Sequence, residues 1–226
     1  MNENQLDLVI YHNLHDKRDF YMGSFASDEL GDPSLQICGE LDDSSGKDLK
    51  TCFSFIANTL ERNPKTASKF TRNPVMNNNG KMGHWLALFV QMTRKKISLK
   101  FADSFKMPYS YYGEHIKNYI DQYRDIAADY GLQLVFEEMP FRMQQSNSYL
   151  CGGYATYTVL GLKNCNSDSL RKIFSVKFDS KNKRMNDKIV ENFVIKNGPN
   201  LSAQTYFHLP GKHLFVRQRS LRQRGV

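Results

Sequence analysis

The chain has 226 residues, of which 40% are hydrophobic and 24% charged, a composition typical of a globular protein with a sizeable core. No apolar run reaches the length of a membrane span, and the acidic N-terminal segment lacks the apolar centre of a signal peptide. We therefore expect no membrane association. Thirty-one basic and 23 acidic residues give a formal net charge of +8, which is compatible with a polyanionic partner such as DNA.

The four cysteines are sparse and form no Cys-x-x-Cys pair, which argues against a disulfide framework or a zinc cluster. They are Cys38, Cys52, Cys151 and Cys165. This usage is typical of a reducing, intracellular compartment. No glycine-rich phosphate loop or metal-ligand spacing is present, so we expect no required cofactor.

The first third of the chain carries weaker signals than the rest. Leu6 and the apolar residues 8–11 predict a short strand. Across 49–60, apolar residues recur at helical spacing and predict a helix with Cys52 facing the core. The polar segment 61–83 contains two Asn-Pro pairs, which predicts a long exposed loop.

Two strand patterns follow that loop. The near-continuous apolar run 84–90 predicts a buried strand, and the alternation over 97–101 predicts a second one. Asp103 comes just after the second strand, and His84 opens the first. If the strands pair as a hairpin, both side chains reach the same edge of the sheet. There, a carboxylate could hold the imidazole in one tautomer and stabilise its cation.

The remaining patterns predict one strand and four helices. A helix over 116–127 ends near Gly131, a strand over 132–136 is ended by Pro140, and a helix follows over 151–162. The next helix is capped by Ser167 and has Leu170, Ile173 and Phe174 on its inner face. The last helix has Met185, Ile189, Phe193 and Val194 on its inner face. Together they predict an α+β fold, a small mixed sheet flanked by helices. We expect one domain over 1–211 and a mobile basic tail over 212–226.

The helix over 151–162 begins with an unusual sequence. A polar segment, 144–148, here called the glutamine loop, leads into Cys151-Gly152-Gly153. A cysteine in the first helical turn lies among unpaired backbone N–H groups, which favour its thiolate. Taken alone, Cys151 would more often be a small buried core residue, and His84 and Asp103 would more often be structural.

Three signals occur in a fixed order: Gly83-His84-Trp85 opens a strand, Asp103 follows the next strand, and Gln-x-Asn-x-x-x-Cys-Gly opens a helix. In this order they resemble the adenovirus protease (adenain) and its relatives, the SUMO- and NEDD8-specific cysteine proteases. The resemblance covers about residues 83–162. It implies a cysteine protease with Cys151 as nucleophile, His84 as its base and Asp103 as the residue that orients His84.

The resemblance also implies a glutamine whose side-chain amide, with the Cys151 backbone N–H, donates to an oxyanion. Gln145 lies six residues before Cys151, as in the SUMO-protease branch, and Gln144 lies seven before it, as in the adenovirus branch. Neighbouring residues of an extended loop point to opposite sides, so we expect one of the two to reach the site. We favour Gln145, because Asn147 keeps the expected two-residue offset from it.

The sequence is compatible with more than one kind of substrate. We expect Trp85 to line a narrow substrate cleft and Gly152, with Gly153, to keep it open. The short basic chain favours a viral maturation endopeptidase that cleaves structural precursors at small, glycine-containing sites, located in the virion and host nucleus. The alternative is a deconjugating protease that removes a ubiquitin-like modifier after its Gly-Gly terminus.

The adenovirus branch also implies stimulation by DNA and by a disulfide-linked peptide. The peptide linkage is not carried over, because no cysteine lies between Cys52 and Cys151. A hypothesis from a different class is a basic nucleic-acid-binding protein whose Cys151 is structural.

Overall fold

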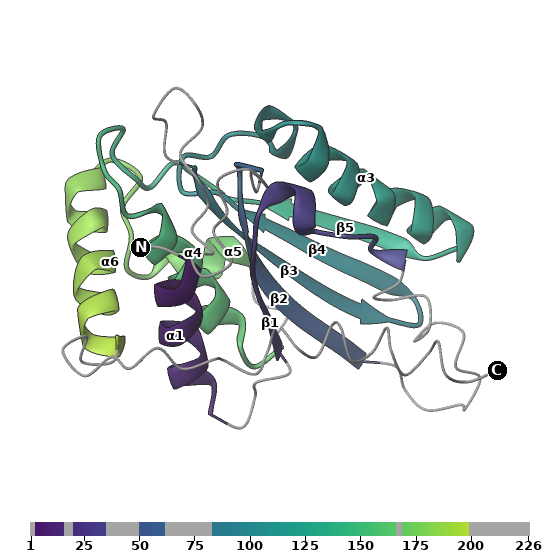
Figure 1. Cartoon of the computed structure of the whole chain (residues 1–226), viewed down its shortest axis with the longest axis horizontal. Helices are drawn as coiled ribbons and strands as arrows, with labels where there is room; N and C mark the ends of the chain where they lie inside the picture. Colours follow the sequence, from purple (N-terminus) through teal and green to yellow (C-terminus); the bar gives the residue numbers. More distant parts are fainter. Residues whose placement is uncertain (1–2, 16–19, 35–49, 62–82, 166–168, 199–226) are drawn as a thin grey trace.

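The computed structural model describes residues 3–15, 20–34, 50–61, 83–165 and 169–198. It confirms the predicted α+β class (Figure 1). One sheet has the strand order β1-β2-β3-β4-β5, with bounds Tyr21–Phe25, Lys50–Asn58, Trp85–Thr93, Lys96–Ala102 and Gln133–Glu138. The two pairs that involve β3 are antiparallel, and the two outer pairs are parallel. The helices are α1 (Glu3–Leu14), α3 (Glu114–Asp129), α4 (Cys151–Leu162), α5 (Leu170–Ser175) and α6 (Lys183–Asn197), with short 3-10 turns η2 (Ser27–Glu29) and η3 (Tyr109–Tyr112).

Helices cover both faces of the sheet and bury two separate cores. The α3 core includes Leu99, Phe101, Ile120 and Tyr123. The α4 core includes Leu6 of α1, Phe89 of β3, Val159 of α4 and Val190 of α6. Alternate residues of β3 contribute to different cores: Trp85, Ala87 and Phe89 to the α4 core, and Leu86, Leu88 and Val90 to the α3 core. Burial on both faces explains why this strand reads as a continuous apolar run.

The predicted N-terminal strand is wrong, because residues 3–14 form α1. Leu6, Ile10 and Leu14 recur every four residues, are almost fully buried and pack into the α4 core. The buried Asp7 accepts hydrogen bonds from the hydroxyls of Tyr21 and Ser24, at 2.9 and 2.6 Å, and so ties α1 to β1. The run of apolar residues at 8–11 obscured the helical period.

The predicted helix over 49–60 is also wrong, since this segment is β2. Ile56 lies in the α4 core, while Phe53 and Phe55 lie in the α3 core. A strand with both faces buried loses the period-two alternation, and a short apolar run of this kind also fits a helix. β2 pairs in register with β3, from Lys50 opposite Thr93 to Asn58 opposite Trp85.

The other predicted helices and strands are present, although some caps and inner faces differ from those expected. α5 is capped by Ser169, whose side chain accepts from the Lys172 N–H, and the predicted cap Ser167 lies outside the described residues. Met185 was expected inside but is 51% exposed, because α6 instead buries Asn186, Asp187 and Val190. The predicted tail over 212–226 and most of the predicted loop over 61–83 also lie outside the described residues. None of the helices among the residues described is long and apolar enough to cross a membrane.

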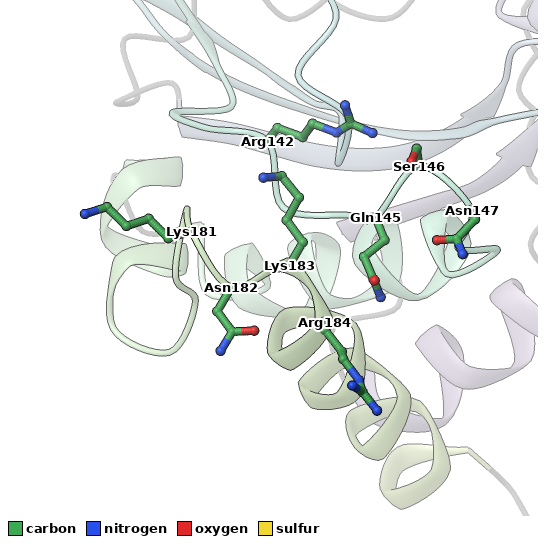
Figure 2. A pocket seen from close by; sticks show the side chains of 8 residues that line it. All are labelled: Arg142, Gln145, Ser146, Asn147, Lys181, Asn182, Lys183 and Arg184. Atoms are coloured by element: carbon green, nitrogen blue, oxygen red, sulfur yellow. The ribbon is translucent and has the colours of Figure 1, made fainter.

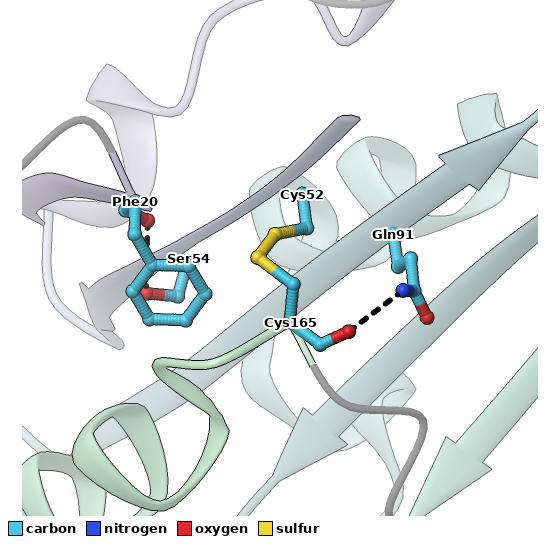
Figure 3. Close-up of a disulfide and its surroundings, with 5 residues drawn as sticks. All are labelled: Phe20, Cys52, Ser54, Gln91 and Cys165. Atoms are coloured by element: carbon cyan, nitrogen blue, oxygen red, sulfur yellow. Dashed lines mark hydrogen bonds between the residues drawn. A yellow bond between two sulfur atoms is a disulfide. The ribbon is translucent and has the colours of Figure 1, made fainter. Parts of the chain in front are cut away.

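A disulfide joins Cys52 of β2 to Cys165, which follows the end of α4 (Figure 3). Their Cα atoms are 5.9 Å apart across 113 residues of sequence. The side chain of Gln91 donates to the backbone carbonyl of Cys165 at 2.9 Å. Cysteine spacing did not predict this pair, because β2 was taken as a helix and the two residues meet only when α4 packs on the sheet.

Candidate active site

The β3–β4 hairpin brings His84 and Asp103 together. His84 lies immediately before β3 and Asp103 immediately after β4, and the two strands are antiparallel, so both residues lie at one edge of the sheet. The Nε2 atom of His84 is 2.6 Å from Oδ1 of Asp103. The backbone of His84 is also fixed, since its N–H donates to Thr59 Oγ1 at 2.9 Å and its carbonyl accepts from the Thr59 N–H at 2.9 Å.

Asp103 has a side chain that is only 1% exposed and accepts several hydrogen bonds. Besides His84, its donors are the backbone N–H groups of Phe105 and Met107, at 2.9 and 2.6 Å, and the hydroxyl of Tyr112, at 2.8 Å. Burial by itself raises the pKa of this carboxyl, but the hydrogen bond and charge of His84 and the other donors lower it overall. Asp103 is therefore a fixed anion.

Two aromatic rings stack on the imidazole of His84. The centroid of Phe105 is 4.8 Å away and that of Tyr112 is 5.6 Å away, with interplanar angles of 26° and 22°. They leave the His84 side chain 12% exposed. Neither residue was predicted from the sequence. The aromatic-rich segment 105–112, directly after Asp103, was the signal that could have pointed to them.

Cys151 is the first residue of α4, and its side chain interacts with that of His84. Since Nε2 of His84 is engaged by Asp103, Nδ1 is the ring atom left for the sulfur. The backbone N–H groups of Trp85 and Gly152 also help to lower the pKa of this thiol. No side chain caps the start of α4, so its first N–H groups remain oriented towards this region.

Cys151 and His84 shift each other's protonation. Burial raises the pKa of the Cys151 thiol, but the hydrogen bond and positive charge of His84 lower it overall. Burial likewise lowers the pKa of His84, but hydrogen bonds to Asp103 and Cys151 and their negative charges outweigh this and raise it from 6.5 to about 9. Both shifts favour a thiolate–imidazolium pair near neutral pH.

The two glutamines point to different parts of the molecule. The Gln144 side chain is fully buried, accepts from Ser104 Oγ at 2.5 Å and donates to the Ser148 carbonyl at 2.7 Å. The Gln145 side chain donates to Asp187 of α6 at 2.8 Å. Gln144 is therefore turned towards the segment that carries Asp103, whereas Gln145, the glutamine we favoured, is turned towards α6.

Trp85 and the glycines lie deeper than expected. The Trp85 side chain is only 5% exposed and belongs to the α4 core, so little of the indole can line a cleft. A Cβ at Gly153 would lie 2.6 Å from Cγ1 of Val190. Gly153 thus permits α6 to approach α4 and does not open a cleft, contrary to our expectation. The substrate-binding role of Gly152, which is buried, stays a prediction.

Comparisons with known proteins identify distant structural similarity only. No protein-family model and no curated protein matches the chain. A crystal structure of an ASFV protease matches with 13% identity and a TM-score of 0.46, over 83% of this chain and 65% of that one. A de-sumoylating protease matches with 14% identity and a TM-score of 0.38, over 87% of this chain and 74% of that one. A SUMO protease with its catalytic cysteine oxidised matches with 14% identity and a TM-score of 0.39, over 87% and 78%.

The chain thus spans slightly less than two thirds of the ASFV protease. Similarities of this size do not assign the chain to a family, so its function has to be inferred from the geometry of the site.

Proposed function

We propose that the chain is a cysteine protease in which Cys151 is the nucleophile and His84 its proton acceptor and donor. Asp103 positions His84 and stabilises its cation. The observation that carries this proposal is that Cys151, at the start of a helix, and His84 shift each other's pKa, while a buried carboxylate lies 2.6 Å from the imidazole of His84. A nucleophile, a base and an orienting group in contact are the arrangement that thiol-dependent acyl transfer requires.

In the first step the Cys151 thiolate attacks the carbonyl carbon of the scissile peptide bond. A carbon–sulfur bond forms, and the carbonyl electron pair moves onto the oxygen. The backbone N–H of Cys151 and a side-chain amide are the donors that we assign to this oxyanion. Each such donor contributes about 3–4 kcal/mol in comparable sites.

We assign the side-chain donor to Gln144 instead of Gln145. Gln144 approaches Ser104, the neighbour of Asp103, and its buried amide nitrogen uses one N–H for the Ser148 carbonyl. The second N–H of that nitrogen is left for a substrate oxygen, which it can reach once the segment around the fully buried Gln144 opens. Gln145 would have to leave Asp187 before it could do the same.

In the second step the imidazolium of His84 gives its proton to the leaving amine, and the carbon–nitrogen bond breaks. The product is a thioester between Cys151 and the acyl part of the substrate. His84, now neutral, takes a proton from a water molecule that attacks the thioester. Expulsion of the thiolate completes the cycle and restores the ion pair.

For the substrate, we propose protein precursors cleaved at small, glycine-containing sites, as in viral maturation. The basic balance of the chain supports this choice. Removal of a ubiquitin-like modifier remains the alternative within the same chemistry. A nucleic-acid-binding protein with a structural cysteine would not need the contact between Cys151 and His84. Stimulation by DNA stays a prediction from composition.

Two covalent probes test the proposal: a Gly-x-Gly peptide and a ubiquitin-like modifier ending in Gly-Gly, each carrying a C-terminal electrophile. We expect the native protein to form an adduct with at least one probe. The Cys151→Ser variant should form none, and His84→Ala should react at least about 100-fold more slowly. Cys38→Ser is the matched control and should react like the native protein.

The relative rates with the two probes distinguish precursor cleavage from deconjugation. Adduct formation by Cys151→Ser, or the absence of any adduct with either probe, would overturn the proposed chemistry.

A further inference from the structure

A basic pocket lies beside the glutamine loop (Figure 2). It has a volume of about 460 Å³. Its eight lining residues are Arg142, Gln145, Ser146, Asn147, Lys181, Asn182, Lys183 and Arg184. They come from two segments, the glutamine loop with Arg142 and the turn that enters α6. Four of the eight are basic and none is acidic, and the proposed reaction uses none of them.

Positive charge exceeds negative charge around this pocket, although the exposed carboxylate of Asp179 accepts from the Lys181 backbone N–H at 2.8 Å. Among the residues that the structure describes, the four basic side chains form no ion pair. The adjacent carboxylate of Asp187 is 6% exposed and accepts hydrogen bonds from Gln145 and, at 2.9 Å, from the Tyr154 hydroxyl. It is thus directed towards the protein interior. Several cations in one concave surface create a positive potential that attracts anions.

We propose that the basic pocket binds the phosphate groups of a compact oligophosphate. Its lining offers positive charge and neutral N–H and O–H donors, and it contains no aromatic or aliphatic side chain that could hold a base or an acyl chain. Arginine and lysine form strong charge-assisted hydrogen bonds with phosphate oxygens.

The position of the start of α6 supports the same ligand. Lys183 is the first residue of this 15-residue helix, and Asn182 caps it by accepting from the Met185 N–H. The partial positive charge at a helix start adds to that of the basic side chains and favours a phosphate.

A ligand here would act on the glutamine loop. Arg142 lines the pocket, and its Nε donates to the Gln144 carbonyl at 3.2 Å. Its guanidinium also lies 5.4 Å from the ring centroid of Phe105, which stacks on His84. An oligophosphate that bridges Arg142 and Lys183 would therefore tie the loop to α6 and reduce the motion of the loop.

Binding of tripolyphosphate to the full chain, measured by calorimetry, tests this proposal. The pocket variant is Lys183→Gln/Arg184→Gln. The matched control, Lys95→Gln/Arg171→Gln, removes the same charge from exposed positions outside the pocket. We expect tripolyphosphate to bind the native protein and the control equally, and the pocket variant about 10-fold more weakly. Hydrogen exchange of the backbone amides of 145–148 should slow when the ligand binds.

The thermal midpoint of each variant without ligand shows whether the substitutions leave the fold intact. The single variant Lys181→Gln, at an exposed position, should also bind tripolyphosphate more weakly than the native protein. Absence of binding, or an equal loss of affinity in the pocket and control variants, would overturn the proposal. A short DNA duplex distinguishes the source of the phosphates. If DNA loses affinity in the pocket variant while tripolyphosphate does not bind, the pocket holds a nucleic-acid backbone and the oligophosphate proposal is wrong. If only tripolyphosphate loses affinity, the proposal stands.

Discussion

The two sides of the candidate site are held in different ways. The His84–Asp103 side is fixed by strand register, by the several donors to Asp103 and by two rings stacked on His84. The glutamine loop has no strand register and is held by individual hydrogen bonds: Gln144 bonds to Ser104 and Ser148, and Gln145 bonds to Asp187 of α6. Register holds a residue in one place, whereas a loop can exchange one partner for another. This difference shows where substitutions should alter chemistry and where they should alter the position of a donor.

The largest expected effect is on the rigid side. Asp103→Asn should lower turnover by roughly 10²- to 10⁴-fold, because an amide can hold the ring but cannot stabilise its cation. Asp103 helps to raise the pKa of His84 to about 9, so its loss should move the alkaline limit of activity to lower pH. Turnover measured across neutral and alkaline pH checks both effects. Full activity with an unchanged alkaline limit would mean that another residue orients His84.

Substitution of the two glutamines tests the loop side. Gln144→Ala should lower turnover by roughly 100- to 1,000-fold, as expected for loss of one oxyanion donor. Gln145→Ala removes only the bond to Asp187 and should change turnover by a few-fold. The comparison requires kcat for both variants on one substrate. A large loss confined to Gln145→Ala would restore the choice made from the sequence and would show that the loop rearranges when substrate binds.

A smaller effect is expected where α4 meets α6, the contact on which the position of Gln145 depends. Gly153→Ala should lower the free energy of unfolding by about 1–3 kcal/mol, because the added methyl group meets Val190. In a Val190→Ala background the same change should cost less, because only Val194 Cγ2, 3.2 Å from the added methyl group, then remains close. Denaturant unfolding of the four proteins measures both changes. Equal destabilisation in both backgrounds would contradict this packing.

The same contrast explains what the sequence could predict. The hairpin and the start of α4 follow from local patterns, so the meeting of His84 with Asp103 and the helical position of Cys151 were accessible from spacing alone. Loop geometry has no such period. The sequence indicated that Gln144 and Gln145 diverge, but their partners lie 40 and 42 residues away along the chain. The disulfide of Cys52 was missed for a similar reason, since a strand with both faces buried has no diagnostic period.

The thiolate–imidazolium pair of Cys151 and His84 is the feature on which the proposed chemistry depends. The ion pair is expected at pH values above the lowered pKa of the Cys151 thiol and below about 9, where His84 loses its proton. Ultraviolet absorbance of the thiolate, recorded against pH and corrected with Cys151→Ser, measures it directly. The native protein should show the Cys151 thiolate at neutral pH. His84→Ala should show it only as the pH approaches 9.0, the ordinary thiol value. Identical titrations of the native protein and His84→Ala would contradict the ion pair.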